Sequence, residues 1–204
     1  MMNELIAALR QMTLAEVIAV VLGVVYLVLA VKRSRWCWVA GGISSAIVIW
    51  LSAQRGLPMQ AWLNVYYVIV SVYGYWHWTD ADIPRPAISL LPLRWHVIDT
   101  AAVILVSVLT AQYLVRETQA AWPYLDSLTT WGSLYTTWLV ARVKLENWVY
   151  WFVIDAVEAF LFFEQKLYLL GLMTAVTLIV IVFGHRSWWR TWREQGGTAL
   201  PVGA

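Results

Sequence analysis

Long apolar runs alternate with short polar breaks along most of the chain. Seven runs, each close to the roughly 20 residues with which a helix crosses a bilayer, lie at about 14–31, 36–54, 58–79, 95–114, 125–142, 146–164 and 167–185. Two longer connections, 80–94 and 115–124, isolate the fourth run, and the first is rich in proline and aspartate, as an exposed linker would be. The pattern predicts an all-α integral membrane protein with seven transmembrane helices in a single membrane domain, 1–204.

Composition supports a multi-pass membrane protein. Apolar residues make up 61% of the chain and charged residues only 13%, whereas a soluble domain is about a quarter charged. The net charge of +2 gives no reason to expect nucleic acid as a partner, and a single cysteine, Cys37, excludes an internal disulfide. No secretory signal peptide is expected, because residues 1–11 lack a basic segment followed by a short apolar core.

The basic residues predict how the bundle is oriented. Ten of the fourteen lysines and arginines fall on one side of the predicted helices. These are Lys32, Arg33, Arg35, Arg85, Arg94, Arg142, Lys144, Arg186, Arg190 and Arg193. By the positive-inside rule this side is cytoplasmic, so the amino terminus is expected outside and the carboxy terminus inside. The tail 194–204 contains three glycines and is expected to be disordered.

One part of the chain also resembles another part further along. When residues 38–74 are moved forward by 110 positions without gaps, Trp38 aligns with Trp148 and Gly74 aligns with Gly184. The boundaries of the apolar runs match under the same shift. The alignment therefore predicts an internal repeat.

The repeat predicts two parallel three-helix units, 14–79 and 125–185, joined by a linker helix, 95–114. This 3+1+3 plan is typical of a class of secondary transporters that bind substrate between the two halves near the membrane midplane. Ser45 aligns with Asp155 under the same shift. Both residues should lie at the same depth, which indicates a shared central cavity.

The sixth run carries the strongest candidate binding residues. Trp148, Trp151, Asp155 and Glu158 follow one another at spacings of three, four and three, which places them on one helical face. An ionisable side chain near mid-membrane costs at least a few kcal/mol on insertion scales, so it indicates function. Two indoles beside carboxylates favour a flat, cationic organic ligand. Alternatively, Asp155 forms a structural hydrogen bond, to an indole or to Arg142, and Glu158 faces a neighbouring subunit or an outer vestibule.

The third run offers a second polar face, formed by Asn64, Tyr67 and Ser71 at helical spacing. The Asn64 amide can both donate and accept hydrogen bonds, so it could recognise an amide or a sugar hydroxyl. A hydrogen bond between helices is an equally good interpretation of Asn64. No metal-binding or catalytic motif accompanies these residues. We therefore expect no enzyme activity, no metal and no cofactor.

Three segments resemble the PnuC family of bacterial vitamin transporters. They are 36–45, 62–78 and 141–155, and the likeness extends over 23–189. The most specific strings are Tyr-Gly-aromatic-x-x-Trp in the second segment and Glu-x-Trp-x-x-Trp-x-x-x-Asp in the third. Asn64 stands where relatives often have glutamine.

The resemblance implies a seven-helix bundle similar in architecture to the SWEET sugar transporters. It also implies a homotrimer in the bacterial inner membrane that imports nicotinamide riboside for NAD biosynthesis. Passage is expected to be facilitated diffusion, made one-way when a cytoplasmic kinase phosphorylates the substrate. The resemblance assigns substrate contacts to Trp148, Trp151, Asp155 and Asn64, and the residue patterns add Tyr67, Ser45 and Glu158 as candidates.

Other substrates fit the same scaffold. Some PnuC-like proteins (PnuT) carry thiamine, which is also flat and cationic, and the Asp155 carboxylate would suit its aminopyrimidine as an acceptor. Riboside carriers often have an amide at this position. A sugar carrier of the SWEET type would not need Asp155, and a membrane-embedded sensor or scaffold would not need a polar, aromatic midplane face. Nicotinamide riboside is the leading expectation and thiamine the second.

Overall fold

A computed structural model describes residues 12–56, 58–79, 87–117 and 122–197. Within them the chain forms seven helices. They are α2 (Leu14–Val31), α3 (Trp36–Gln54), α4 (Pro58–His77), α5 (Leu93–Glu117), α6 (Pro123–Ala141), α7 (Asn147–Glu164) and α8 (Tyr168–Glu194). The prediction of an all-helical chain with seven helices is confirmed. By length and hydropathy, α2, α3, α5 and α8 qualify as membrane spans.

The helix ends follow local sequence signals. Before α2, the Thr13 hydroxyl accepts a hydrogen bond from the backbone N–H of Glu16 at 3.3 Å, while the Glu16 carboxylate accepts the Thr13 N–H at 2.6 Å. This reciprocal capping box satisfies two amides that the first helical turn leaves without partners. Arg55 pairs with the same carboxylate at 2.5 Å and so connects the start of α2 to the end of α3. Pro123 begins α6, where its missing N–H costs no hydrogen bond.

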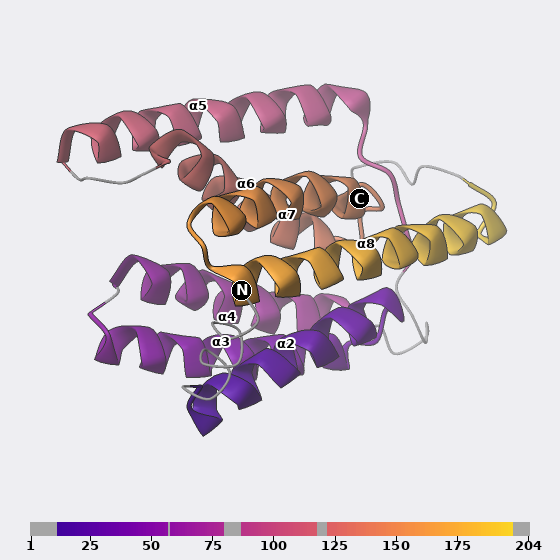
Figure 1. The fold of residues 1–204 in the computed structure, drawn as a ribbon. Coiled ribbons are helices and arrows are strands. Elements are labelled where there is room, and N and C mark those ends of the chain that lie inside the picture. The colour runs from indigo at the N-terminus through magenta and orange to yellow at the C-terminus, as the bar shows by residue number, and fades with distance from the viewer. Residues whose placement is uncertain (1–11, 57, 80–86, 118–121, 198–204) are drawn as a thin grey trace.

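The helices form two groups with α5 on the outside (Figure 1). In the first group, α3 packs against both α2 and α4; in the second group, α7 packs against both α6 and α8. The groups meet where α4 contacts α6 and where α2 contacts α8, and α5 contacts α6. We refer to α2–α4 as the first group and to α6–α8 as the second group.

Each group contains a tryptophan packed directly on a glycine. A Cβ atom added to Gly74 would overlap the indole of Trp38, and one added to Gly184 would lie 2.5 Å from the indole of Trp148. Real Cβ atoms do not approach other atoms so closely, so any larger residue must displace the indole. Both positions need glycine because the indole occupies the space where a side chain would go.

Each of these tryptophans also meets a second tryptophan edge to face. Trp38 and Trp78 have ring centroids 5.4 Å apart at an interplanar angle of 84°, and Trp148 and Trp188 have centroids 5.4 Å apart at 83°. Trp78 and Trp188 correspond under the same shift of 110 positions, although they lie just beyond the aligned segment. Edge-to-face geometry is the arrangement that aromatic quadrupoles favour.

The second tryptophan of each pair donates a hydrogen bond to the other group. The indole N–H of Trp78 donates to the carbonyl of Ala141 at 3.0 Å. The indole N–H of Trp188 donates to the carbonyls of Ala30 and Val31, at 3.2 and 3.1 Å. Val31 and Ala141 correspond under the same shift. The two groups are therefore joined at the ends of α2 and α6 by a reciprocal pair of hydrogen bonds.

The turns between helices repeat as well. Arg33 and Val143 adopt left-handed backbone conformations, with φ of 52° and 54°. Gly56 and Lys166 do the same, with φ of 67° and 60°. A left-handed residue commonly ends a helix, because it reverses the chain while its N–H satisfies a terminal carbonyl. Each of these two pairs of turn residues is related by the shift that aligns the two groups.

The segment before α5 is less exposed than the linker prediction implied. Ser89 exchanges backbone hydrogen bonds with Val143 and Leu145, the Lys144 ammonium donates to the Ser89 hydroxyl at 2.9 Å, and Ile88 is 2% exposed. The reason is that the α6–α7 turn offers unpaired backbone groups to which an extended segment can bind. Burial lowers the pKa of Lys144 below its usual range.

Helix α8 is longer than predicted. It continues to Glu194, whereas the apolar run ends near 185, because good helix-forming residues continue after hydropathy falls. Arg186, Arg190 and Arg193 therefore lie on a helix. The predicted connections and tail fall partly on 80–86, 118–121 and 198–204, which lie outside the described residues.

Candidate functional site

Two cavities lie side by side between the helix groups. One, of about 210 Å³, is lined by Gly23, Tyr26, Trp38, Gly41, Ser44, Ser45, Tyr67, Ser71, Thr137 and Trp151. The other, of about 350 Å³, is lined chiefly by apolar residues of α2, α7 and α8 together with Asn147, Trp148, Trp151, Asp155 and Thr177. We call the first the serine pocket and the second the aspartate pocket. Gly23, Tyr26 and Trp151 line both, so the pockets adjoin.

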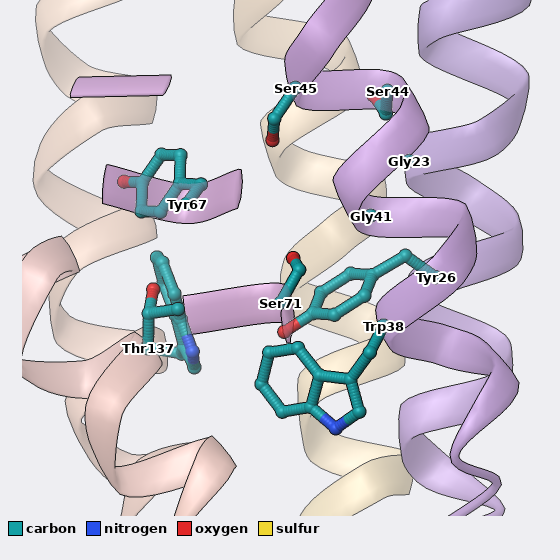
Figure 2. A pocket seen from close by; sticks show the side chains of 10 residues that line it. Gly23, Tyr26, Trp38, Gly41, Ser44, Ser45, Tyr67, Ser71 and Thr137 are labelled. Atoms are coloured by element: carbon teal, nitrogen blue, oxygen red, sulfur yellow. The ribbon is translucent and has the colours of Figure 1, made fainter. Parts of the chain in front are cut away.

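The serine pocket presents hydroxyl groups on several sides (Figure 2). Ser44 and Ser45 lie at one end of the view, while Tyr26 and Trp38 lie near Ser71 at the other. The Ser44 hydroxyl is already occupied, because it donates to the carbonyl of Ala19 at 2.8 Å. The buried Ser45 hydroxyl is thus the better placed of the two to meet a ligand.

The aspartate pocket contains a buried carboxylate. Asp155 is 5% exposed, and no hydrogen bond or ion pair reaches its carboxylate from the residues that the structure describes. Arg142, one alternative partner, donates instead to the hydroxyl of Tyr73 at 3.4 Å. The indole N–H of Trp148 is also buried, without a partner in the described part of the chain. An unpaired buried carboxylate is costly, so this pocket favours a ligand that brings a positive charge or a donor.

The remaining candidates divide between the two pockets and the helices around them. Tyr67 lines the serine pocket from α4. Glu158 lies one turn beyond Asp155 on α7 and interacts electrostatically with both Asp155 and Asp126, but lines neither pocket. Asn64 is 5% exposed, and its amide donates at 2.9 Å to the carbonyl of Gln60 in its own helix. The structure therefore brings Asn64 to neither pocket.

Tyr26 is the site residue that sequence reasoning missed. It lines both pockets from α2, and its ring packs so closely on α3 that a Cβ at Gly41 would lie 2.9 Å from it. A signal was present in the sequence. Between residues 17 and 31, only Gly23 and Tyr26 interrupt an otherwise aliphatic run. Gly23 and Tyr26 are three residues apart and so share one helical face. A small residue and an aromatic hydroxyl on one face indicate that this face contacts protein or a cavity and not lipid.

Comparisons with known proteins all identify transporters as relatives of this chain. The family model described as "Nicotinamide mononucleotide transporter" matches residues 13–190. The chain is 24% identical over 167 residues to the nicotinamide riboside transporter PnuC of Escherichia coli, covering 68% of this chain and 69% of that protein. It is 23% identical over 194 residues to the riboflavin/roseoflavin transporter RibM of Streptomyces davaonensis, covering 91% and 89%.

A solved structure shares the fold. The crystal structure of the vitamin B3 transporter PnuC matches with a TM-score of 0.71 at 22% identity, covering 88% of this chain and 82% of that chain. At this identity, the likeness shows the fold alone.

Proposed function

Because this chain belongs to the nicotinamide mononucleotide transporter family, which confirms the PnuC-type resemblance, we propose that it imports nicotinamide riboside across the bacterial inner membrane. The observation that carries the proposal is Asp155, a buried carboxylate without a partner in the described residues, in a cavity lined by Trp148 and Trp151. The relatives named above are transporters, which agrees with a transporter and not an enzyme.

The chemistry of the aspartate pocket suits a pyridinium ring. A buried carboxylate attracts a delocalised positive charge more strongly than water-exposed carboxylates do, because the surroundings screen it less. An indole face attracts the same charge through its quadrupole. The hydroxyls of the serine pocket, next to it, would accept the ribose, whose own hydroxyls need partners when water is removed.

The architecture supports movement of the two helix groups against each other. We infer that they are parallel repeats joined by α5 in a 3+1+3 plan, as in SWEET-like carriers, with the amino terminus outside. The support is the matched set of tryptophan contacts, interhelical hydrogen bonds and left-handed turns at positions 110 apart. A site between two such halves can be exposed to each side in turn.

The family resemblance supplies the rest of the proposal. It comprises a homotrimer, facilitated diffusion, and capture of the imported substrate by a cytoplasmic kinase. Apolar side chains are exposed along α5 on successive turns, including Val97, Ile98, Ile104, Leu105 and Leu109. Such a face suits lipid or a neighbouring subunit. A non-transporting sensor is the weaker interpretation, because it would not need two adjoining pockets between the groups.

Thiamine is the second candidate substrate. Its thiazolium ring is cationic, and the Asp155 carboxylate would accept a hydrogen bond from its aminopyrimidine. Riboflavin belongs in the same experiment, because RibM aligns over most of this chain. Riboflavin is neutral, so it could donate hydrogen bonds to Asp155 but would lack the charge–charge attraction that a cationic ring gains.

The decisive experiment is calorimetric binding to the purified protein with nicotinamide riboside, thiamine and riboflavin in parallel. We expect the riboside to bind, and Asp155→Ala to weaken that binding while the protein still inserts. The matched control is Glu164→Gln, which removes a carboxylate from the exposed outer end of the same helix. Binding of thiamine alone would change the substrate and keep the site. Unaltered riboside binding by Asp155→Ala would remove Asp155 from the site.

A further inference from the structure

A groove runs between α7 and α8 on the outside of the bundle. Its volume is about 230 Å³, and its walls are almost wholly apolar. They are formed by Trp148, Val149, Phe152, Ile181 and Val182, with His185 and Arg186 at one end. Val149 is 53% exposed and Phe152 is 45% exposed, so the groove opens outward. We call it the outer groove.

A basic pocket continues from that end of the outer groove. It is an open depression along the last turns of α8, where Arg186, Arg190 and Arg193 follow at helical spacing beside Glu194. His185 and Arg186 line both the groove and the basic pocket, so the two form one continuous surface. An apolar channel that ends in a cluster of arginines has the polarity of a phospholipid.

We propose that this surface is a binding site for one anionic phospholipid of the cytoplasmic leaflet. An acyl chain would lie in the outer groove, and the phosphate would meet the arginines. Arginine suits this role because its planar fork can donate two parallel hydrogen bonds to a phosphate. The cytoplasmic leaflet carries the anionic lipids, and the positive-inside rule places this end of α8 there.

Two side chains add independent support. The Nδ1 atom of His185 is buried and has no hydrogen-bond partner among the described residues. The rest of the His185 side chain lines the junction of the groove and the basic pocket, where a headgroup or its glycerol would arrive. Trp189, 44% exposed in the basic pocket, is the amphipathic residue typical of the membrane interface.

The first group lacks this arrangement. The residues 110 positions before His185, Arg186, Trp189 and Arg190 are Tyr75, Trp76, Thr79 and Asp80. None of these four is basic, although this end of α4 is the equivalent helix end. The first group has Lys32, Arg33 and Arg35 on this side, but they lie between α2 and α3. It is α8 that carries arginines on successive turns of one helix, next to an apolar groove.

The site also has a defined relation to the candidate substrate cavity. Trp148 is a wall of the outer groove and a wall of the aspartate pocket. A lipid chain in the groove would therefore contact the same residue that lines the cavity. The lipid would help to hold that indole in place on Gly184.

Native mass spectrometry of the full chain, released from micelles containing phosphatidylglycerol or phosphatidylcholine, tests the proposal. We expect the protein to retain phosphatidylglycerol in preference to phosphatidylcholine. The double variant Arg186→Gln/Arg190→Gln should weaken that retention by about fivefold for each arginine removed, or about 25-fold in total. The matched control is Arg116→Gln, which removes an exposed charge from the end of α5 and should retain the lipid normally.

A second variant tests the groove separately from the charges. Val182→Trp should fill the outer groove and reduce retention of phosphatidylglycerol although all the arginines remain. Equal retention of both lipids, or normal retention by the double arginine variant, would overturn the proposal. If inorganic phosphate displaces the lipid and Val182→Trp has no effect, the arginines bind a free anion and the lipid site is rejected. Thermal unfolding confirms that each variant is folded.

Discussion

The two helix groups share their packing but differ in the residues that line the cavities. Trp38 on Gly74 in the first group matches Trp148 on Gly184 in the second, with nearly equal geometry. At the cavity, the small, polar Ser45 of the first group corresponds to Asp155 of the second. Gly41 corresponds in the same way to Trp151.

The matched tryptophan–glycine contacts belong to the scaffold, and under the proposed function the unmatched cavity positions serve the ligand. A tryptophan that fills the space above a glycine can be replaced in neither group without a clash or a void. The cavity positions are packed differently in the two groups, since Gly41 lies against the Tyr26 ring whereas Trp151 lines both pockets. A pocket with a carboxylate and indoles beside a pocket with small hydroxyl residues suits an asymmetric ligand, such as a charged ring attached to a sugar.

The largest expected effect comes from adding a methyl group at the packed glycines. Gly74→Ala and Gly184→Ala should each lower the free energy of unfolding by about 1–3 kcal/mol or more, because the added Cβ would overlap the indole. The measurement is thermal unfolding in detergent, together with the yield of folded protein. Gly23→Ala is the control, since its Cβ would lie 4.0 Å from the nearest side-chain atom. If only one of the two variants loses stability, the two groups do not depend equally on this packing.

Substitutions at the cavity should weaken ligand binding to different extents in the two groups. Asp155→Ser, which copies the residue of the first group, should weaken binding of nicotinamide riboside about ten- to hundredfold, because a charge-assisted contact is worth about 1.5–3 kcal/mol. Ser45→Ala should weaken it only a few-fold, as expected for loss of a neutral hydrogen bond. Calorimetry on both variants checks this ranking. Equal losses would show that recognition is shared evenly between the groups.

Removing the hydrogen bonds between the groups should lower stability on both sides, and more on the side of Trp188. Trp78→Phe and Trp188→Phe each leave carbonyl oxygens of the other group without their indole donor, at a cost of about 1–2 kcal/mol. Thermal midpoints measure the effect, with Trp50→Phe as a control because Trp50 is 54% exposed. Trp188 should show the greater loss, since it donates to two carbonyls. Unchanged midpoints for both variants would mean that these bonds do not stabilise the bundle.

The smallest expected effect is a pH dependence of stability that arises from Lys144 in the α6–α7 turn. Lys144 in the second group corresponds to Ser34 in the first. Burial lowers the pKa of Lys144 below its usual 10.5 in the folded state, so its charged form disfavours folding at neutral pH. Stability should therefore rise as the pH increases from the lowered pKa towards 10.5, by less than about 1 kcal/mol because the amine is only half-buried.

Lys144→Ser should remove this rise. Thermal midpoints of the wild type and the variant, followed from neutral pH to pH 10.5, measure the difference between the two curves. Parallel curves over the whole range would show that the amine is too well solvated to be linked to folding.

Much of the fold could be predicted from the chain because the relevant signals are local. Apolar runs of the right length located all seven helices of the described chain, and spacings of three and four placed Trp151 and Asp155 on one face of α7. The internal alignment stopped at Gly74, so the Trp78–Trp188 correspondence just beyond it was not used. The extension of α8 was missed because hydropathy ends where charges begin, whereas helical hydrogen bonding continues.

Other features depended on contacts between distant segments. The polar face of α4 suggested that Asn64 and Tyr67 act together, yet Asn64 bonds to Gln60 and only Tyr67 of the two reaches a pocket. A helix has more than one partly buried face, and spacing alone does not say which neighbour each face meets. The buried contact of Ser89 with the α6–α7 turn was likewise invisible, because its partners are far away along the chain.

The sequence by itself determined the helices, their apolar character and the carboxylate and indoles of α7, since each depends on residues within a few turns of one another. Only the tertiary structure decided that Tyr26 of α2 completes both pockets and that each group donates an indole hydrogen bond to the other. Periodicity specifies which residues share a face. Which faces meet depends on the packing of the whole bundle, in which each of these tryptophans packs on a glycine of another helix.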